Sequence, residues 1–127
     1  MITVRATIKG EPDIPAFTKL YEYGSADEEI FFSSSAMVEE KLRCGMKLNA
    51  NEALVLLCSF VVKSIRAGKQ DASIRNDAAK ILSAGNTLIG VAETLRLITF
   101  EARIDSKPAR KIVFKEPISA SKSLLAS

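Results

Sequence analysis

The sequence of 127 residues contains no histidine and no tryptophan. It has only two cysteines, two tyrosines and six phenylalanines. A chain without histidine cannot supply a Ser-His-Asp or Cys-His nucleophile system. It also lacks the imidazole ligands that dominate zinc, nickel and copper sites. Acid–base chemistry would fall to carboxylates, lysine, tyrosine or cysteine. The composition therefore excludes several common enzyme classes for this chain acting alone.

Strong charge and long apolar runs are missing too. Eighteen basic against fifteen acidic residues leave a net charge of +3, which is mild and interspersed, so we expect no nucleic-acid partner. No apolar run approaches the ~18 residues that span a bilayer, so we expect no membrane segment. The N-terminus alternates in polarity, unlike a secretory signal. Cys44 and Cys58 lack CxxC spacing, and we expect two reduced thiols in a cytoplasmic, single-domain protein.

Hydrophobic periodicity predicts a strand at the start of the chain, helices in the middle and a hairpin near the end. Residues 2–8 alternate apolar and polar side chains, as in a half-buried strand. Leu97–Ile104 and Lys111–Phe114 are rich in β-forming residues and flank a longer turn at 105–109, which is typical of a hairpin. Helices are expected over residues 16–23, 25–45, 49–68, 71–85 and 88–95. The predicted fold class is α+β, a bundle of about four main helices with a C-terminal antiparallel hairpin and an extra N-terminal strand.

Helix boundary signals are clearest around the second main helix. Asn49 is a good N-cap, and Glu52 three residues later completes a pair similar to a capping box. Gly45 before this helix and Gly68 after it are typical left-handed C-terminal stops. The isolated hairpin would be only marginally stable. Its edge therefore needs cover from the strand at residues 2–8 or from another chain.

A search for self-contained chemistry finds no catalytic, cofactor-binding or metal-ligating set. The acidic run Asp27–Glu29 suits a helix N-terminus, where negative charge is favourable. Ser33–Ser35 lacks a Gly-x-Ser-x-Gly elbow and is interpreted as a close helix contact. Arg66–Lys69 is interpreted as a basic helix end, because it lacks the first glycine and the Ser/Thr of a phosphate loop. A small enzyme that uses Cys44, which has basic neighbours in sequence, stays open as an alternative.

One stretch resembles a known family. Gly45–Ala53 reads Gly-Met-Lys-Leu-Asn-Ala-Asn-Glu-Ala and resembles the Gly-Leu-Lys-Leu-Asn-x-x-Glu-Ala segment of urease gamma subunits. Arg66-Ala-Gly-Lys resembles that family's Ala-Arg-x-Gly-Lys, and Gly90-Val-Ala-Glu resembles Gly-Val-Pro-Glu. Glu101-Ala102 and Pro117-Ile118 resemble the residues that start and close the family's hairpin. The resemblance covers residues 26–118.

The resemblance implies a structural role. It implies a gamma-type subunit of a urease, associated with beta-type and alpha-type chains as a trimer of heterotrimers. Nickel, and the hydrolysis of urea to ammonia and carbamate, would belong to the alpha chain. It divides the chain into an N-terminal extension at 1–24, a urease-gamma-like domain at 25–118 and a flexible tail at 119–127. Candidate structural or interface residues are Gly45, Lys47, Asn49, Glu52, Gly68, Glu101 and Pro117.

Departures from the family pattern keep two further alternatives open. The family's opening Leu-Thr-Pro-x-Glu is replaced here by Tyr21–Ser25 after a longer N-terminus. The turn at 105–109 differs from Pro-Asp-Gly, and Phe114 takes the place of a histidine. The chain is therefore also considered as a stand-alone interaction or self-assembly module that reuses the gamma fold, or as a subunit of a related amidohydrolase.

Overall fold

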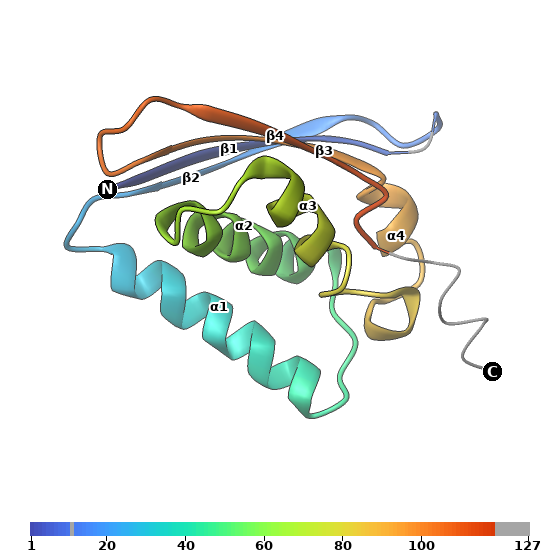
Figure 1. Cartoon of the computed structure of the whole chain (residues 1–127). Helices are drawn as coiled ribbons and strands as arrows, with labels where there is room; N and C mark the ends of the chain where they lie inside the picture. Colours follow the sequence, from blue (N-terminus) through green and yellow to red (C-terminus); the bar gives the residue numbers. More distant parts are fainter. Residues whose placement is uncertain (11, 119–127) are drawn as a thin grey trace.

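The computed structural model describes residues 1–10 and 12–118, and the predicted tail at 119–127 lies outside this part of the chain. A four-stranded sheet forms one layer, and the helices all lie against one of its faces (Figure 1). The elements in chain order are β1 (Ile2–Lys9), β2 (Phe17–Tyr23), α1 (Glu28–Arg43), α2 (Ala50–Arg66), α3 (Asp71–Ala78), the 3₁₀ turn η1 (Ala84–Asn86), α4 (Val91–Thr94), β3 (Leu97–Ile104) and β4 (Arg110–Lys115). The α+β class is confirmed.

The sheet has the strand order β2-β1-β3-β4 and is antiparallel throughout. The predicted N-terminal strand lies beside the hairpin, with Ile2 opposite Ile104 and Ile8 opposite Ile98. It thereby covers the β3 edge that a two-stranded hairpin would leave open. Side chains alternate between the two faces of a strand, and those of β1 that point to the helices are buried, namely Ile2, Val4, Ala6 and Ile8.

The helix expected over residues 16–23 is wrong, because Phe17–Tyr23 forms strand β2. Phe17, Leu20 and Tyr21 fit helical spacing, but the segment is also rich in aromatic and β-branched residues that suit strands. Pairing along the whole of β1 decides between the two. On the inner face, Tyr21 and Tyr23 pack against Phe31 of α1, with ring centroids 6.0 and 5.1 Å apart.

Helix α2 lies between α1 and the sheet (Figure 1), and its broadly apolar sequence suits this buried position. Its buried residues are Ala53, Leu54, Leu56, Leu57, Cys58, Ser59, Val61, Val62 and Ser64. Other helix bounds differ from expectation. Helix α1 begins at Glu28 after Asp27 rather than after Ser25, and α3 ends at Ala78 rather than near Gly85. A 3₁₀ turn and the short helix α4 replace the rest of the expected third and fourth helices.

Candidate functional site

The α1–α2 loop is fixed by local backbone hydrogen bonds. Gly45 has φ = +78°, a left-handed conformation that glycine adopts without steric cost. Its N–H donates to the Leu42 carbonyl at 3.0 Å, and the Met46 N–H donates to the Lys41 carbonyl at 2.9 Å. This pair of bonds is a Schellman motif and satisfies carbonyls that the helix end leaves free. Gly45 therefore ends α1, as its position in the sequence predicts.

The capping pair predicted for α2 is confirmed. The Asn49 side chain accepts a hydrogen bond from the Glu52 N–H at 2.8 Å, and the Asn49 N–H donates to Glu52 Oε1 at 3.0 Å. Lys41 of α1 donates to the other carboxylate oxygen of Glu52. The Asn49 N–H, and then Lys41, hold the pKa of Glu52 below its ordinary value because both favour the charged form. One carboxylate thus caps α2 and ties it to α1.

Leu48 anchors the same loop to a distant part of the chain. Its N–H donates to the Asn86 carbonyl at 2.8 Å, and its carbonyl accepts from the Leu88 N–H at 2.9 Å. The side chain is fully buried. The loop Gly45–Asn49 is therefore held at both ends and in its middle, while Lys47 within it stays exposed.

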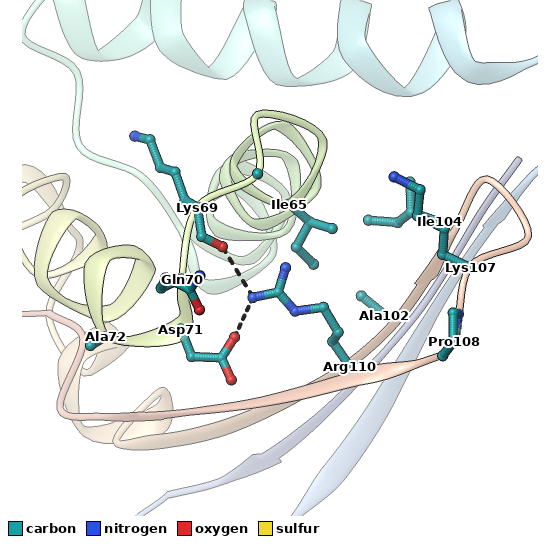
Figure 2. A pocket seen from close by; sticks show the side chains of 11 residues that line it. Ile65, Lys69, Gln70, Asp71, Ala72, Ala102, Ile104, Lys107, Pro108 and Arg110 are labelled. Carbon is teal, nitrogen blue, oxygen red and sulfur yellow. Dashed lines mark hydrogen bonds and ion pairs between the residues drawn. The ribbon is translucent and has the colours of Figure 1, made fainter.

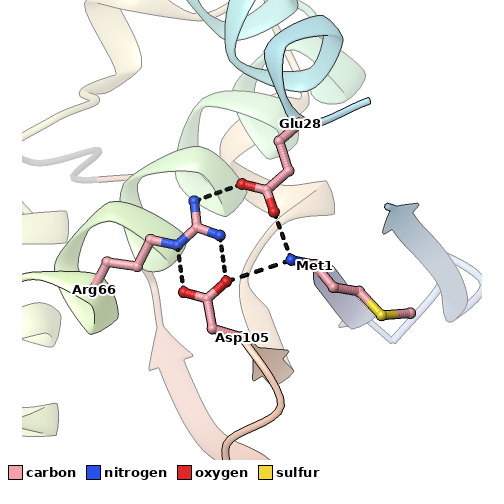
Figure 3. A network of polar contacts seen from close by, with 4 residues as sticks. All are labelled: Met1, Glu28, Arg66 and Asp105. Carbon is pink, nitrogen blue, oxygen red and sulfur yellow. Dashed lines mark hydrogen bonds and ion pairs between the residues drawn. The ribbon is translucent and has the colours of Figure 1, made fainter. Parts of the chain in front are cut away.

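A polar network joins four elements that are far apart in the sequence (Figure 3). Arg66, the last residue of α2, pairs with Asp105 in the β3–β4 turn through two hydrogen bonds of 3.0 and 2.8 Å. It also pairs with Glu28 at the start of α1 at 2.8 Å. The Met1 amine lies 2.6 Å from Glu28 and 3.4 Å from Asp105. Arg66 is the main reason that the pKa values of both carboxyls are lowered.

The residues after Arg66 also serve the fold. Gly68 has φ = +77° and forms a second Schellman motif, with its N–H bonded to the Ile65 carbonyl at 3.0 Å. The Lys69 ammonium pairs with Asp77 of α3 at 3.2 Å and lies 6.0 Å from the centre of the Phe60 ring. The basic helix end predicted here is thus used for contacts within the chain.

A hollow of about 610 Å³ lies between the α2–α3 connection and the hairpin (Figure 2). Arg110 of β4 extends into it and donates to the Lys69 carbonyl at 3.1 Å and to Asp71 at the start of α3. The sequence did not indicate these two contacts, because the residues that they join lie about forty positions apart. No local signal could have found them.

The sequence-derived candidates do not form one site. Gly45, Lys47 and Asn49 lie in the α1–α2 loop, and Glu52 lies in the first turn of α2. Gly68 follows α2 at the opposite end of that helix. Glu101 is exposed on β3, and Pro117 is buried just after β4. Phe114, which takes the place of the family's histidine, is buried and packs edge-on against Phe100 with ring centroids 5.3 Å apart.

Potential nucleophiles are also dispersed. Cys44 is exposed at the end of α1, and its thiol lies 3.8 Å from Glu40 Oε1. Cys58 is buried in α2, and burial raises the pKa of its thiol. In the described part of the chain, no group of three or more Asp, Glu, Cys or His side chains is arranged to hold a metal ion. Within the same residues, no helix has the length and hydrophobicity needed to cross a membrane.

Comparison with known proteins extends the sequence resemblance. The family model described as "Urease, gamma subunit" matches residues 24–118, which begin directly after β2 and end just beyond β4. A curated relative, the urease subunit gamma of Paracoccus denitrificans (strain Pd 1222), is 34% identical over 76 residues. That alignment covers 59% of this chain and 74% of the relative.

Proposed function

Because this chain belongs to the urease gamma subunit family, we propose that it is a non-catalytic, gamma-type structural subunit of a cytoplasmic urease. Its partners would be beta-type and alpha-type chains in a trimer of heterotrimers. Urea hydrolysis to ammonia and carbamate would take place at a dinuclear nickel site in the alpha-type chain. The observation that carries the proposal is the family match over residues 24–118, which includes the α1–α2 loop and the hairpin.

The residues of this chain do not fit a nickel site. The sequence has no histidine, and the described residues contain no cluster that could hold a metal. We therefore assign no step of the hydrolysis to this chain. Its polar contacts instead join its own elements, through Glu52 between α1 and α2 and through Arg66 between α1, α2 and the hairpin turn.

The candidate residues then separate into two proposed roles. Gly45, Asn49, Glu52, Gly68 and Pro117 would shape the surface that partner chains contact, because they fix helix ends or are buried. Lys47 and Glu101 are exposed and would contact partners directly. We further propose that residues 1–24 are an extension added to a gamma-type domain at 25–118.

A second function is favoured by one specific observation. Strand β1 covers the edge of β3 along its whole length, which supports a stand-alone interaction module that needs no other chain to complete its sheet. Removing residues 1–20 would then cause unfolding or aggregation of the isolated chain. A truncated chain that stays folded and monomeric would contradict this alternative.

Affinity purification tests the main proposal. The chain carrying a C-terminal tag is expressed together with the beta-type and alpha-type chains of its own source, and the captured proteins are quantified. We expect equal amounts of the three chains and nickel in the captured complex. Capture of this chain alone, or with a nickel-free amidohydrolase instead, would contradict the proposal.

A further inference from the structure

The hollow beside the hairpin tip is lined by the cationic side chains of Lys107 and Arg110, and Asp71 is the acidic residue in its described lining. Arg110 uses one terminal nitrogen of its guanidinium for Asp71 and for the Lys69 carbonyl, and its other nitrogens have no hydrogen-bond partner among the described residues. Lys107 also lines the hollow, and its ammonium has no ion-pair partner in the same part of the chain. The Lys69 ammonium points away from Arg110 (Figure 2) and pairs with Asp77.

The rest of the lining combines apolar and polar residues. Its larger apolar residues are Ile65, Ile104 and Pro108, and its polar residues include Gln70 and Asp71. Concave sites of several hundred Å³ that combine an apolar lining with a few polar groups are typical of specific binding sites. The hollow therefore places an apolar surface next to two cationic groups, Lys107 and Arg110, that have free N–H donors in the described part of the chain.

The hairpin turn that carries Lys107 is held in an unfavourable backbone conformation. Asp105 and Ser106 have φ values of +55° and +62°, which lie in the left-handed region that non-glycine residues adopt only at a cost. The two hydrogen bonds from Arg66 to Asp105, together with the Asp105 N–H bond of 2.9 Å to the Met1 carbonyl, hold the turn in place. Lys107 is thus presented from a fixed turn rather than from a loose loop.

A second hollow, of about 690 Å³, lies on the other side of the same turn. It shares Lys107 and Pro108 with the first, and its lining includes Arg5 and Arg103 on the outer face of the sheet. Glu101 is its one acidic lining residue among those described. Both sides of the hairpin tip are therefore positively charged, whereas the net charge of the whole chain is only +3.

We propose that the hollow lined by Lys107 and Arg110 binds an acidic segment of another polypeptide chain, with a carboxylate bound by the two cations and an apolar side chain against Ile65 and Ile104. A cation without an ion-pair partner among the described residues, such as Lys107, and a guanidinium with free N–H donors, such as Arg110, favour a partner of opposite charge at an interface and speed its association. The proposal deepens the proposed function and rests on it in one respect, because the acidic segment would belong to another subunit of the urease assembly.

The isolated chain tests the binding site directly. Amide signals of the ¹⁵N-labelled protein are followed by NMR during titration with the peptide acetyl-Glu-Leu-Glu-amide, with acetyl-Gln-Leu-Gln-amide as the matched neutral control. We expect shifts at residues 68–72 and 107–110 with the acidic peptide only, weakened by raising the salt from about 0.05 M to about 0.5 M. Equal shifts with both peptides, or shifts elsewhere, would overturn the proposal.

Two charge-reversal variants complete the test. Lys107→Glu should weaken binding of the acidic peptide at least about fivefold. Lys80→Glu is the control, because Lys80 is exposed and lies outside both hollows. Equal binding by both variants, with unchanged melting temperatures, would contradict the proposed site.

The same variants are then captured with the beta-type and alpha-type chains. If the wild-type chain captures no partner, the proposed function fails while the peptide result still decides the site. If the wild type and Lys107→Glu capture equal amounts, the site plays no part in assembly and the inference fails, although the proposed function stands. Loss of capture by Lys107→Glu alone supports both.

Discussion

Replacing Asn49 by alanine tests the cap of the central helix. The change removes the oxygen that accepts the Glu52 N–H at 2.8 Å, while the backbone bond to Glu52 Oε1 can persist. Asn49 is exposed, so the substitution leaves no cavity. Loss of a side-chain N-cap costs about 1 kcal/mol, within a range of roughly 0.5–2 kcal/mol.

This cost can be converted into a melting temperature. The entropy of unfolding near 60 °C is about 2.1 cal/mol/K per residue. A chain of 127 residues therefore has an unfolding entropy of about 0.27 kcal/mol/K. A loss of about 1 kcal/mol then lowers the melting temperature by about 4 °C. We expect the denaturation midpoint to fall while the denaturant m-value stays constant, because the surface exposed on unfolding does not change.

Circular dichroism during heating, with a parallel chemical denaturation series, measures this shift. Asn49→Asp should retain most of the stability, since aspartate caps about as well as asparagine. Asn51→Ala is the matched control two residues later, where the side chain is exposed within the first turn and alanine is the better helix former. An unchanged Asn49→Ala variant, or an equal loss in Asn51→Ala, would refute the capping argument.

Three further predictions concern backbone strain, acid stability and thiol accessibility. Gly45→Ala should lower the free energy of unfolding by about 1–2 kcal/mol, because φ is +78° at this residue. Gly24→Ala is the control and should change the free energy of unfolding little, because Gly24 has open space around it and no positive φ. Equal losses of stability for the two variants in chemical denaturation would contradict the left-handed conformation assigned to Gly45. Since the pKa of Glu52 is lowered in the folded state, its contribution is present above about pH 4.5 and is lost as the pH falls through the folded value. The free energy of unfolding of Glu52→Gln should therefore fall less steeply in acid than that of the wild type. An equal slope of this free energy against pH below about pH 4.5 would refute the prediction. An aromatic disulfide reagent should modify Cys44 rapidly and Cys58 only after unfolding. Rapid modification of both cysteines in the native protein would contradict the burial of Cys58.

Elements with explicit boundary signals could be predicted from the sequence. Asn49 with Glu52, and the glycines at 45 and 68, define helix ends through interactions within a few residues. The alternation in residues 2–8 gave the right strand because one face is buried. At these positions the local signals and the structure agree.

Elements that depend on distant partners could not be predicted. Residues 17–23 are a strand because β1 lies beside them, not because of their own spacing. Helix α3 ends early, at Ala78, where no glycine or proline marks a helix end in the sequence. The contacts of Arg66 with Asp105 and of Arg110 with Asp71 each join residues 39 positions apart. The hollow at the hairpin tip is lined by residues from these distant segments.

The measurement that tests the central claim most directly is the urea-hydrolysing activity of the beta-type and alpha-type chains, expressed with and without this chain. If the chain is a gamma-type structural subunit, activity and assembly should depend on its presence and should survive Cys44→Ser. Full activity and an intact assembly in its absence would contradict the proposed function.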